Sequence, residues 1–440
     1  MSRTEKMPTA PEITTLGPAK LPTPLGSGYF CKEEERIPLS VDSSISQDLK
    51  EPQIMLFEPA GPRTHLYFDP GKVKCAIVTC GGLCPGLNDV IRAIVMEAHY
   101  CYGVAAVLGI RYGLEGFIPA YKHNIVELKP HDMTEIHQFG GTVLGSSRGP
   151  QPPEAIVDAL ERMNVGVLFV IGGDGSMKAA SMIMEEVRRR NLRMSIIGIP
   201  KTIDNDINFI SQSFGFETAV DKAAEIIRCA HVEAEGVPYG IGMVKLMGRE
   251  SGFIAAQATL AMREVNFVLI PEAPFVLDGE GGLLAALNKR LAARNHAVVV
   301  VAEGAGQHLL KATGKRDPSG NPVLGDITTL LRDSFVNYFK ARGKNATVKV
   351  IDPSYMIRSV PANANDRVYC GFLGQYAVHA AMAGKTDMVV AKIMDRYVHL
   401  PLSMVTTSRR RLDTRSAFWR AVLESTGQDE LKGMYPKDDK

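Results

Sequence analysis

The chain has 440 residues, of which 45% are hydrophobic and 22% charged, and its formal net charge is +2 at pH 7. Such a balanced charge predicts neither a nucleic-acid-binding nor a membrane-binding surface, and no apolar run reaches the roughly 18 residues of a membrane span. The length suffices for two hydrophobic cores, since a single core stops growing at roughly 250–300 residues. The N-terminus lacks the apolar region of a signal peptide, and the seven cysteines indicate reduced thiols in a cytoplasmic protein.

Residues 1–70 differ from the rest of the chain, because prolines are frequent there and hydrophobic periodicity is weak. We interpret them as an N-terminal extension that starts loosely and packs on the body further along. From Lys72 onward, short β-branched runs alternate with longer helical patterns. Strands are predicted at 73–79, 104–108, 167–171, 195–199, 241–246, 266–270, 297–302 and 348–351, and helices at 87–100, 153–163, 177–191, 218–235 and 326–342.

This alternation is typical of parallel sheets that helices cover on both faces. We therefore predict an α/β protein with two Rossmann-like three-layer domains, mainly parallel sheets and an active-site cleft between them. In open α/β sheets, ligands bind outside the carboxyl ends of the strands. Six motifs follow predicted strands, and turn residues alone would explain their glycines but not the accompanying Asp, Arg and Glu. They lie at residues 81–82, 172–176, 200–206, 247–249, 303–304 and 355–358.

Two glycine-rich loops indicate phosphate binding. In residues 79–88, glycines let the backbone approach a ligand, and the following helix attracts anions at its N-terminus; a plain tight turn explains this loop equally well. The loop Gly172-Gly173-Asp174-Gly175-Ser176 adds a carboxylate at a strand end, and Asp174 is the candidate ligand for Mg²⁺. The alternative here is an Asp-Gly turn with Ser176 as a helix cap.

Two carboxylates lie two residues apart in Thr202-Ile203-Asp204-Asn205-Asp206, directly after a predicted buried strand. A kinase needs a carboxylate that accepts the proton of the attacking hydroxyl, and Asp204 is the candidate base. Asp206 would contact Mg²⁺ or the surrounding loop. Lys201 adds a cation suited either to a transferring phosphoryl group or to a salt bridge with one of the two carboxylates. The alternative for the whole motif is an Asx-type turn.

Three later motifs favour a sugar phosphate as the second substrate. Met247-Gly248-Arg249 combines close backbone approach with a guanidinium, which binds oxyanions in a fork. Glu303 is suited to accept hydrogen bonds from sugar hydroxyls. Tyr355-Met356-Ile357-Arg358 supplies a phenol and a second guanidinium, and Lys349 lies six residues before Tyr355. Each alone is more often a surface charge, but their places at successive strand ends favour a binding site.

In the order and spacing of these motifs, the sequence resembles the phosphofructokinase family from about Lys72 to about Met388. The resemblance implies that Asp174 is the magnesium ligand and that the catalytic residues are Asp204, Lys201 and Gly175. It implies a nucleotide site at Gly81, Arg148, Gly149, Gly173, Asp174, Gly175 and Ser176. It implies a fructose 6-phosphate site at Thr202, Ile203, Asp204, Met247, Gly248, Arg249, Glu303, Lys349, Tyr355, Met356, Ile357 and Arg358.

The resemblance also implies a reaction and an organisation. The expected enzyme is an allosteric glycolytic kinase that uses ATP and Mg²⁺ to phosphorylate fructose 6-phosphate, and that forms a homotetramer or a dimer. The expected parts are the extension 1–70, a nucleotide-binding α/β domain at 71–216 plus about 357–405, a sugar-phosphate-binding α/β domain at 217–356, and a C-terminal helix and tail at 406–440.

Some residues depart from the pattern of the bacterial ATP-using members. Lys201 and the long lead resemble the branch that contains pyrophosphate-dependent enzymes, Tyr355 stands where a His is usual, and no arginine lies near Gly240 to contact a phosphate across a subunit interface. Gly175 favours ATP, because only a hydrogen side chain leaves room there, free of negative charge, for an α-phosphate and ribose. Pyrophosphate-using relatives typically carry Asp at this position. We therefore predict ATP, with pyrophosphate as the alternative donor.

Two further alternatives stay open at this point. A Mg²⁺-dependent kinase of lipids or dinucleotides would share a GGDG-type motif, but the motifs after Leu246 speak against it. A regulatory or binding subunit that has lost catalysis is the non-enzymatic alternative, and the intact Asp174, Asp204 and Arg249 speak against that.

Overall fold

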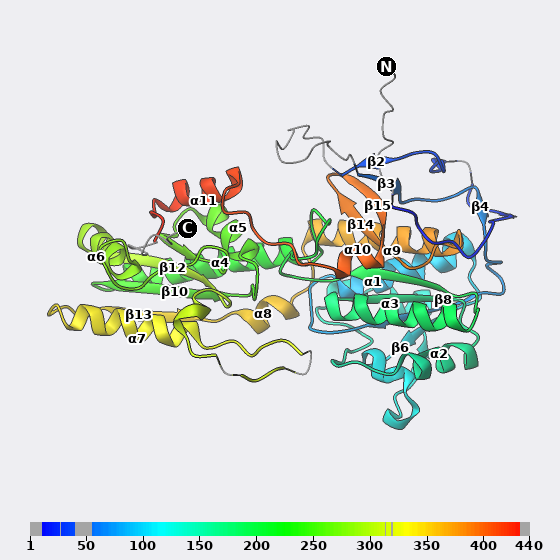
Figure 1. Ribbon diagram of the computed structural model, residues 1–440, viewed down its shortest axis with the longest axis horizontal. Helices are drawn as coiled ribbons and strands as arrows, with labels where there is room; N and C mark the ends of the chain where they lie inside the picture. The colour runs from blue at the N-terminus through cyan, green and yellow to red at the C-terminus, as the bar shows by residue number, and fades with distance from the viewer. Residues whose placement is uncertain (1–10, 27, 40–54, 313, 318–319, 432–440) are drawn as a thin grey trace, which may run out of the picture. The chain divides into compact units, whose positions relative to one another are not determined.

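The structure, a computed structural model, describes residues 11–26, 28–39, 55–312, 314–317 and 320–431. The chain divides into two units, each with its own sheet (Figure 1). Unit 1 comprises the residues up to Thr202, Ile207–Gly215 and Val360–Arg409; unit 2 comprises Ile203–Asp206, Phe216–Ser359 and the residues from Arg410 onward. Within the described ranges, no helix is both long enough and apolar enough to span a membrane.

Unit 1 is built around a nine-stranded sheet with the order β2-β3-β15-β14-β9-β8-β5-β6-β7. Its centre, from β14 to β6, is parallel, and antiparallel strands flank it on both sides. Every residue of β8 and β9 is buried, as expected for parallel strands with helices on both faces. The strands are β2 (Ile37–Pro38), β3 (Leu56–Pro59), β5 (Lys74–Thr79), β6 (Ala106–Ile110), β7 (Ile125–Glu127), β8 (Val167–Gly172), β9 (Ser195–Pro200), β14 (Met388–Ile393) and β15 (Arg396–Pro401).

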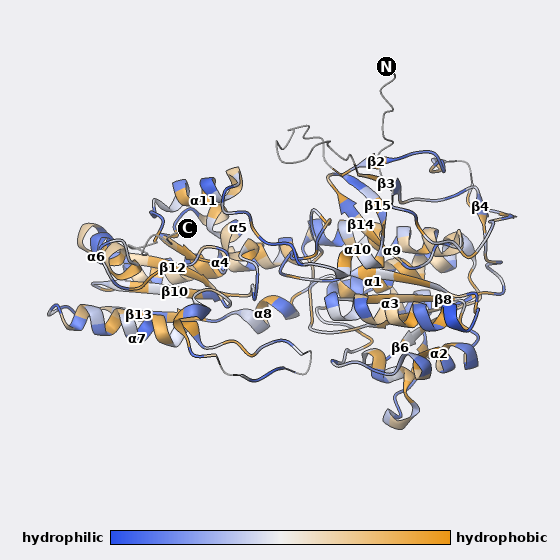
Figure 2. Ribbon diagram, viewed as in Figure 1, coloured by the Kyte–Doolittle hydropathy of each residue, from blue (hydrophilic) through white to orange (hydrophobic). Residues whose placement is uncertain are grey.

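Helices surround this sheet. α2, α3 and α10 share one core cluster with β5, β8 and β9, in which Leu168, Val170 and Ile196 are at most 1% exposed. α1 and α9 pack on each other, and α9 also contacts β9 and β14. Figure 2 shows the hydrophobic residues gathered on the strands and on the helix surfaces that cover them. The helices are α1 (Leu87–Met96), α2 (Pro153–Arg162), α3 (Asp174–Arg189), α9 (Ala364–Met382) and α10 (Leu402–Thr406).

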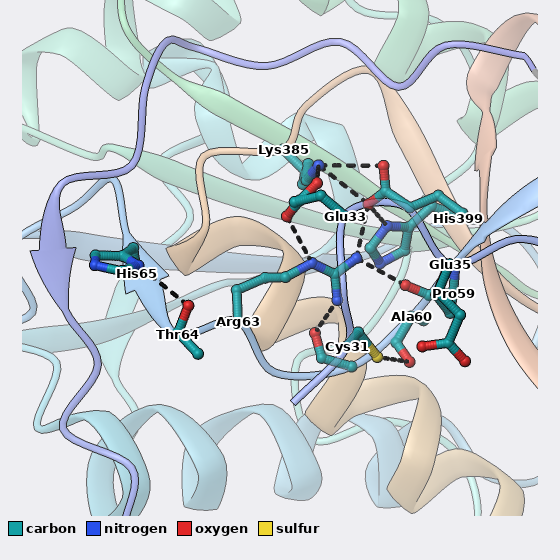
Figure 3. Close-up of polar contacts among 12 residues, drawn as sticks. Cys31, Glu33, Glu35, Pro59, Ala60, Arg63, Thr64, His65, Lys385 and His399 are labelled. Carbon is teal, nitrogen blue, oxygen red and sulfur yellow. Dashed lines mark hydrogen bonds and ion pairs between the residues drawn. The ribbon is translucent and has the colours of Figure 1, made fainter. Parts of the chain in front are cut away.

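Charged side chains join the described part of the N-terminal extension to the last strands of unit 1 (Figure 3). β3 pairs antiparallel with β15, which sets Glu58 opposite His399. Glu58 Oε1 lies 2.9 Å from His399 Nδ1 and accepts a hydrogen bond from Arg63 Nη2 at 2.9 Å, while Lys385 donates to Glu58 and to Glu33. Burial would raise the pKa of Glu58, but His399, Lys385 and Arg63 together hold it well below its usual range. The extension also forms β1 (Leu21–Pro22), which pairs with β4 (His65–Leu66).

Unit 2 contains a four-stranded sheet with the order β11-β12-β10-β13, in which every pairing is parallel. One face packs on α6 and α7 through a core that includes Leu287, Leu331, Phe335 and Val299, all fully buried. α4 contacts β10 and β12, and α5 packs on α4. The strands are β10 (Gly240–Leu246), β11 (Phe267–Leu269), β12 (His296–Ala302) and β13 (Thr347–Ile351); the helices are α4 (Phe216–Glu235), α5 (Phe253–Met262), α6 (Leu283–Arg294), α7 (Ile327–Lys340), α8 (Ser354–Ser359) and α11 (Ala417–Thr426).

The predicted α/β class with mainly parallel sheets is confirmed, and the bounds of the predicted elements shift by up to four residues, as one helix and one strand illustrate. The predicted helix 87–100 is α-helical only to Met96 and continues as a π-helix to Tyr102, whose hydroxyl lies 2.7 Å from His379 Nδ1. The predicted strand 104–108 lies two residues later, as β6. It includes Gly109, where a Cβ would lie 2.6 Å from Leu144 and 2.9 Å from Leu128; such close approach is a common reason for glycine within a strand.

The boundaries of the two units differ in detail from those of the predicted domains. The short segment Ile203–Asp206 belongs to unit 2 although the residues on both sides belong to unit 1. The predicted C-terminal part 406–440 belongs to unit 1 up to Arg409 and to unit 2 from Arg410 onward. The assignment of a nucleotide to one domain and a sugar phosphate to the other stays a prediction.

Candidate active site

In unit 1, the loop after β5 brings its backbone close to a buried cation. Gly81 has a φ of +84°, a conformation that favours glycine, and a Cβ there would lie 3.7 Å from Lys201 Nζ. The Gly81 N–H donates to Ser147 O at 3.0 Å. Two predicted nucleotide-site residues follow Ser147 directly: Arg148, which is exposed, and Gly149, with a φ of +102°. The structure therefore brings this part of the predicted nucleotide set together.

The second glycine loop forms the start of α3. Gly173 is the N-cap, and its carbonyl accepts hydrogen bonds from the N–H groups of Ser176 and Met177 at 2.9 and 3.0 Å. A Cβ on Gly173 would lie 3.3 Å from Lys201 O, whereas a Cβ on Gly175 would meet nothing within 4 Å. The first N–H groups of a helix lack helical acceptors and attract anions, as does the helix dipole. An anion would thus approach at a point where the side of the helix is open.

Asp174 is the first residue of α3, and cations surround its carboxylate. Lys178, one turn further along, donates to Asp174 Oδ2 at 2.9 Å, and Arg409 Nη2 lies 3.9 Å from the same oxygen. The Asp174 side chain is 28% exposed. It could therefore hold a divalent cation through a carboxylate oxygen with water as further ligands, the way in which proteins bind Mg²⁺. Such a cation would take the place of Lys178 or Arg409 at Oδ2.

Lys201 connects the two glycine loops. It is only 7% exposed, and its Nζ donates to Gly82 O at 2.6 Å. Its own N–H donates to Gly172 O at 2.9 Å, as β9 continues alongside β8. An ammonium group held this way lies beside the open backbone of both loops. Thr202 follows it, and its carbonyl accepts a hydrogen bond from Ser213 Oγ at 2.5 Å.

In unit 2, the segment Ile203–Asp206 carries the candidate base. Asn205 between the two carboxylates has a φ of +56°, a left-handed conformation that Asn tolerates better than most residues. Ser251 Oγ donates to the carbonyl of Asp204 at 3.1 Å, and the N–H of Arg410 donates to the carbonyl of Asp206 at 2.8 Å. These contacts fix the backbone of the segment beside the loop that follows β10.

The loops after β10 and β12 pass each other at a distance that only glycine allows. A Cβ on Gly304 would lie 1.8 Å from Arg249 O, and one on Gly248, which has a φ of +129°, would lie 2.3 Å from Ser251 O. The Gly304 N–H donates to Gly248 O at 3.0 Å. The glycines of the predicted MGR and EG motifs therefore place Arg249 beside Glu303.

Glu303 is the centre of a charged group in unit 2. Burial raises the pKa of its carboxyl, and the nearby cations Arg249, Lys245 and Arg358 act in the opposite direction. A side chain with these neighbours is suited to bind hydroxyls of a ligand whose phosphate contacts the guanidinium groups.

Arg358 and Arg249 differ in the partners that they have. Arg358 lies in α8 with its guanidinium over the Tyr355 ring at 4.9 Å, and its buried Nε has no hydrogen-bond partner among the described residues. Arg249 forms an ion pair with Asp317 at 3.5 Å and donates to the carbonyl of Pro322. A buried donor without an acceptor is costly, so an anionic ligand at Arg358 would remove that cost.

Not every predicted residue joins the group around Glu303. Lys349 lies within β13 opposite Gly242 in β10, and its ammonium forms an ion pair with Glu233 of α4. Tyr355 and Met356 are 82% and 58% exposed, whereas Ile357 is buried and belongs to the packing of α8. The strand position of Lys349, before the carboxyl end, explains why its partner is a helix residue.

Several residues near these sites were not identified from the sequence. Lys178 follows Asp174 by four positions on a helix, a spacing that indicates an ion pair. Lys245, the penultimate residue of β10, pairs with Asp352 after β13, and its strand-end position could have identified it. No local sequence pattern indicates the contact of Arg409 with Asp174, because 235 positions of the chain separate the two residues.

The strand-end loops thus present glycine-rich backbone, cations and a carboxylate on an α/β scaffold, an arrangement suited to anionic phosphate compounds. The phosphofructokinase family model matches residues 74–381. The chain belongs to the phosphofructokinase family.

Individual relatives agree with this assignment. The chain is 46% identical to the ATP-dependent 6-phosphofructokinase of Borreliella burgdorferi, with 95% of this chain and 96% of the relative covered. It is 48% identical to the ATP-dependent 6-phosphofructokinase of Amycolatopsis methanolica, with coverages of 93% and 91%. Among solved structures, a pyrophosphate-dependent phosphofructokinase from Marinobacter aquaeolei is similar with a TM-score of 0.66 at 20% identity, over 83% of this chain and 94% of that one. The last likeness concerns the fold alone.

Proposed function

We propose that this chain is an ATP-dependent 6-phosphofructokinase, which transfers the γ-phosphoryl group of ATP to the 1-hydroxyl of fructose 6-phosphate and forms fructose 1,6-bisphosphate. One observation carries the proposal: relatives with this name align at 46–48% identity along at least 93% of the chain. An alignment of that extent includes the loops of both units. The reaction belongs to glycolysis.

The donor phosphates bind at unit 1. The first N–H groups of α3 contact phosphate oxygens, and the glycine loop at Gly81, with Arg148 and Gly149 in the neighbouring loop, leaves room for the phosphates to approach. Lys201, 7% exposed, neutralises charge on the transferring phosphoryl group. In phosphoryl transfer little covalent work is needed, so this positioning and charge neutralisation supply most of the catalysis.

Asp174 is the proposed ligand of Mg²⁺. Its donor chemistry fits, because Mg²⁺ takes one or two carboxylates together with waters and phosphate oxygens, and the neighbouring Gly175 adds no side chain to the space. When bound, the metal ion neutralises the charge that develops on the donor phosphates. Lys178 and Arg409, which contact Asp174 Oδ2, then become available to the phosphates.

The acceptor binds at unit 2. Arg358 and Arg249 hold the 6-phosphate, and for Arg249 this replaces the ion pair with Asp317. Glu303 accepts hydrogen bonds from the sugar hydroxyls. The carboxylate of Asp204 takes the proton of the 1-hydroxyl as the bond from that oxygen to the γ-phosphorus forms and the bond from the γ-phosphorus to the β,γ-bridging oxygen breaks, which releases ADP.

The open space at Gly175 supports ATP over pyrophosphate as the donor. Nothing lies within 4 Å of where a Cβ would be, so an α-phosphate and ribose meet neither bulk nor negative charge. Lys201 serves either donor equally, because it contacts the phosphoryl group that both share.

A reducing compartment and self-association complete the proposal. All seven cysteines are free thiols, five of them buried, which supports the cytoplasm as the location. Assembly as a homotetramer or dimer with allosteric control is part of the same proposal, and light scattering of the purified chain measures the assembly directly.

A product assay tests the function. Purified chain is incubated with fructose 6-phosphate, ATP and Mg²⁺, and fructose 1,6-bisphosphate is measured through aldolase. Asp204→Asn chain prepared in the same way controls for kinases carried over from the host. Diacylglycerol and NAD are offered as acceptors in parallel. We expect phosphorylation of the sugar phosphate alone; phosphorylation of another acceptor, or equal product from both preparations, would contradict the proposal.

A further inference from the structure

Three side chains of unit 2 converge at the amino ends of its strands. His231 and Glu235 lie one turn apart near the end of α4, and His296 is the first residue of β12. One ligand atom from each lies within 4.8 Å of the other two. His231 Nε2 is 3.8 Å from Glu235 Oε2, and the two imidazole rings meet edge to face at 5.2 Å.

The hydrogen bonds of the histidines leave ring nitrogens available. His296 Nδ1 lies 3.1 Å from the carbonyl oxygen of Arg294, and because a carbonyl only accepts, Nδ1 carries the proton and Nε2 has the lone pair. This arrangement of backbone carbonyl and imidazole is the usual outer support of a metal-binding histidine. In His231, the buried Nδ1 has no hydrogen-bond partner within the described part of the chain.

We propose that His231, Glu235 and His296 bind a divalent transition-metal ion of the Zn²⁺ type, with water completing the coordination. Two imidazoles and a carboxylate are a donor set that zinc takes in three-ligand sites, whereas Mg²⁺ prefers oxygen ligands. Ligand atoms around tetrahedral zinc lie about 3.4 Å apart, as follows from bond lengths of about 2.0–2.1 Å. The Glu235 side chain is 63% exposed and is therefore able to rotate and close the difference from 4.8 Å.

The charges that face the site act in both directions. Glu235 and the carboxyl end of α4 favour a cation. Arg290 of α6, whose Nε donates to His296 O at 3.2 Å, opposes one. Burial, followed by the charges of Arg290 and His231, lowers the pKa of His296.

The site is separate from the proposed sugar-phosphate site. His296 begins β12 and Glu303 follows its end, so about 23 Å of strand separate them at 3.3 Å per residue. A bound ion would connect the end of α4 to the start of β12 without touching Arg249, Glu303 or Arg358. We therefore expect metal binding here to stabilise unit 2 and to be independent of the Mg²⁺ that serves the reaction.

Calorimetric titration of full-length chain with Zn²⁺ tests the proposal. The exposed thiols of Cys101 and Cys229 are first replaced by Ser, and excess Mg²⁺ is present to saturate oxygen sites. We expect one Zn²⁺ per chain. His296→Ala and His231→Ala should each weaken binding by more than the roughly 10–100-fold that loss of an outer-shell partner costs. The control His131→Ala, a residue with a 75% exposed side chain in unit 1, should bind like the parent.

Two further readouts separate metal binding from unfolding. Circular dichroism and the kinetics of sugar-phosphate phosphorylation should be unchanged in His296→Ala, and Zn²⁺ affinity of the parent should fall as the pH is lowered through 6, because protonated imidazole cannot bind metal. Absence of Zn²⁺ binding to the parent, or histidine variants that bind Zn²⁺ with the stoichiometry and affinity of the parent, would overturn the proposal.

Discussion

The two units prepare their strand ends for anions in different ways. In unit 1, the proposed donor site is mostly backbone: Gly81 and Gly173 lie close to Lys201, and Gly175 faces open space. In unit 2, the proposed acceptor site is mostly side chain, with the cations Arg249, Lys245 and Arg358 acting on the half-buried Glu303.

The difference follows from what each substrate offers. A chain of phosphates is a repeating anion, which helix N-termini and backbone N–H groups bind without contacts to the groups at either end of the chain. A sugar phosphate has one phosphate and several hydroxyls in fixed positions, so guanidinium and carboxylate side chains are needed to distinguish it. Substitutions in unit 1 should therefore act on the donor, and substitutions in unit 2 on the acceptor or on the chemical step.

The largest effect is expected from the base. Asp204→Asn keeps the size of the side chain but removes its ability to take a proton, so kcat should fall by roughly 10²–10⁴ with little change in either KM. Steady-state kinetics with both substrates measures this. A kcat within a few-fold of the parent would remove Asp204 from the role of base.

A change in the scaffold should alter stability without altering either substrate's KM. Glu58→Gln leaves Arg63 and Lys385 near the single carboxylate of Glu33, and the loss of one partner in a buried ion pair costs about 3–5 kcal/mol. Urea unfolding at pH 7 measures the loss. An unfolding free energy within about 1 kcal/mol of the parent's would show that the cluster is dispensable.

The same cluster predicts a dependence on pH. The pKa of Glu58 is far lower in the folded chain than its usual value, so its stabilisation is complete above the unfolded pKa and declines as the pH falls below it. The parent should therefore lose stability between about pH 5 and pH 3 more steeply than Glu58→Gln does. Parallel slopes would contradict this assignment.

Truncation of the guanidinium groups should affect the acceptor alone. Hydrogen bonds to charged groups are worth about 1.5–3 kcal/mol, so Arg249→Ala and Arg358→Ala should each raise the KM for fructose 6-phosphate by about 10–150-fold and leave the KM for ATP nearly unchanged. Lys349→Ala is the matched control, because its ammonium pairs with Glu233, and we expect a smaller effect. A larger change in the KM for ATP would reverse the assignment of the two sites.

The sequence predicts those parts of the fold and of the candidate site that depend on local pattern. The buried strands β8 and β9 and the glycine loops after them follow from alternation of apolar runs with Gly and Asp, which act locally. Two ion pairs could not be predicted from local pattern. Arg409 pairs with Asp174 across 235 positions of the chain, and Asp317 pairs with Arg249 across 68. For the same reason, the pairing of β3 with β15 was not foreseen from a proline-rich extension.

Lys349 shows what strand-end reasoning leaves open. It lies inside a predicted strand six residues before Tyr355, and the register of β13 with β10 sets it opposite Gly242. The register of a parallel pair depends on packing across the sheet and is not contained in either strand alone.

The smallest predicted effect concerns the donor loop. Gly175→Asp should lower kcat/KM for ATP at least about tenfold, equivalent to about 1.4 kcal/mol of transition-state binding, because the carboxylate would fill the open space and repel an α-phosphate. Gly175→Ala, which adds a methyl group where nothing lies within 4 Å, is the control and should lose much less. Equal losses of kcat/KM in the two variants would indicate that the substitutions act through the backbone of α3 and not through the space beside it.

The most direct measurement is the ratio of kcat/KM for ATP to that for pyrophosphate, with fructose 6-phosphate and Mg²⁺ at fixed concentrations and the unmutated chain. The open space at Gly175 and the identity to ATP-dependent relatives predict a ratio well above one, and a lower ratio in Gly175→Asp. A ratio below one in the unmutated chain would contradict the assignment of ATP as the donor.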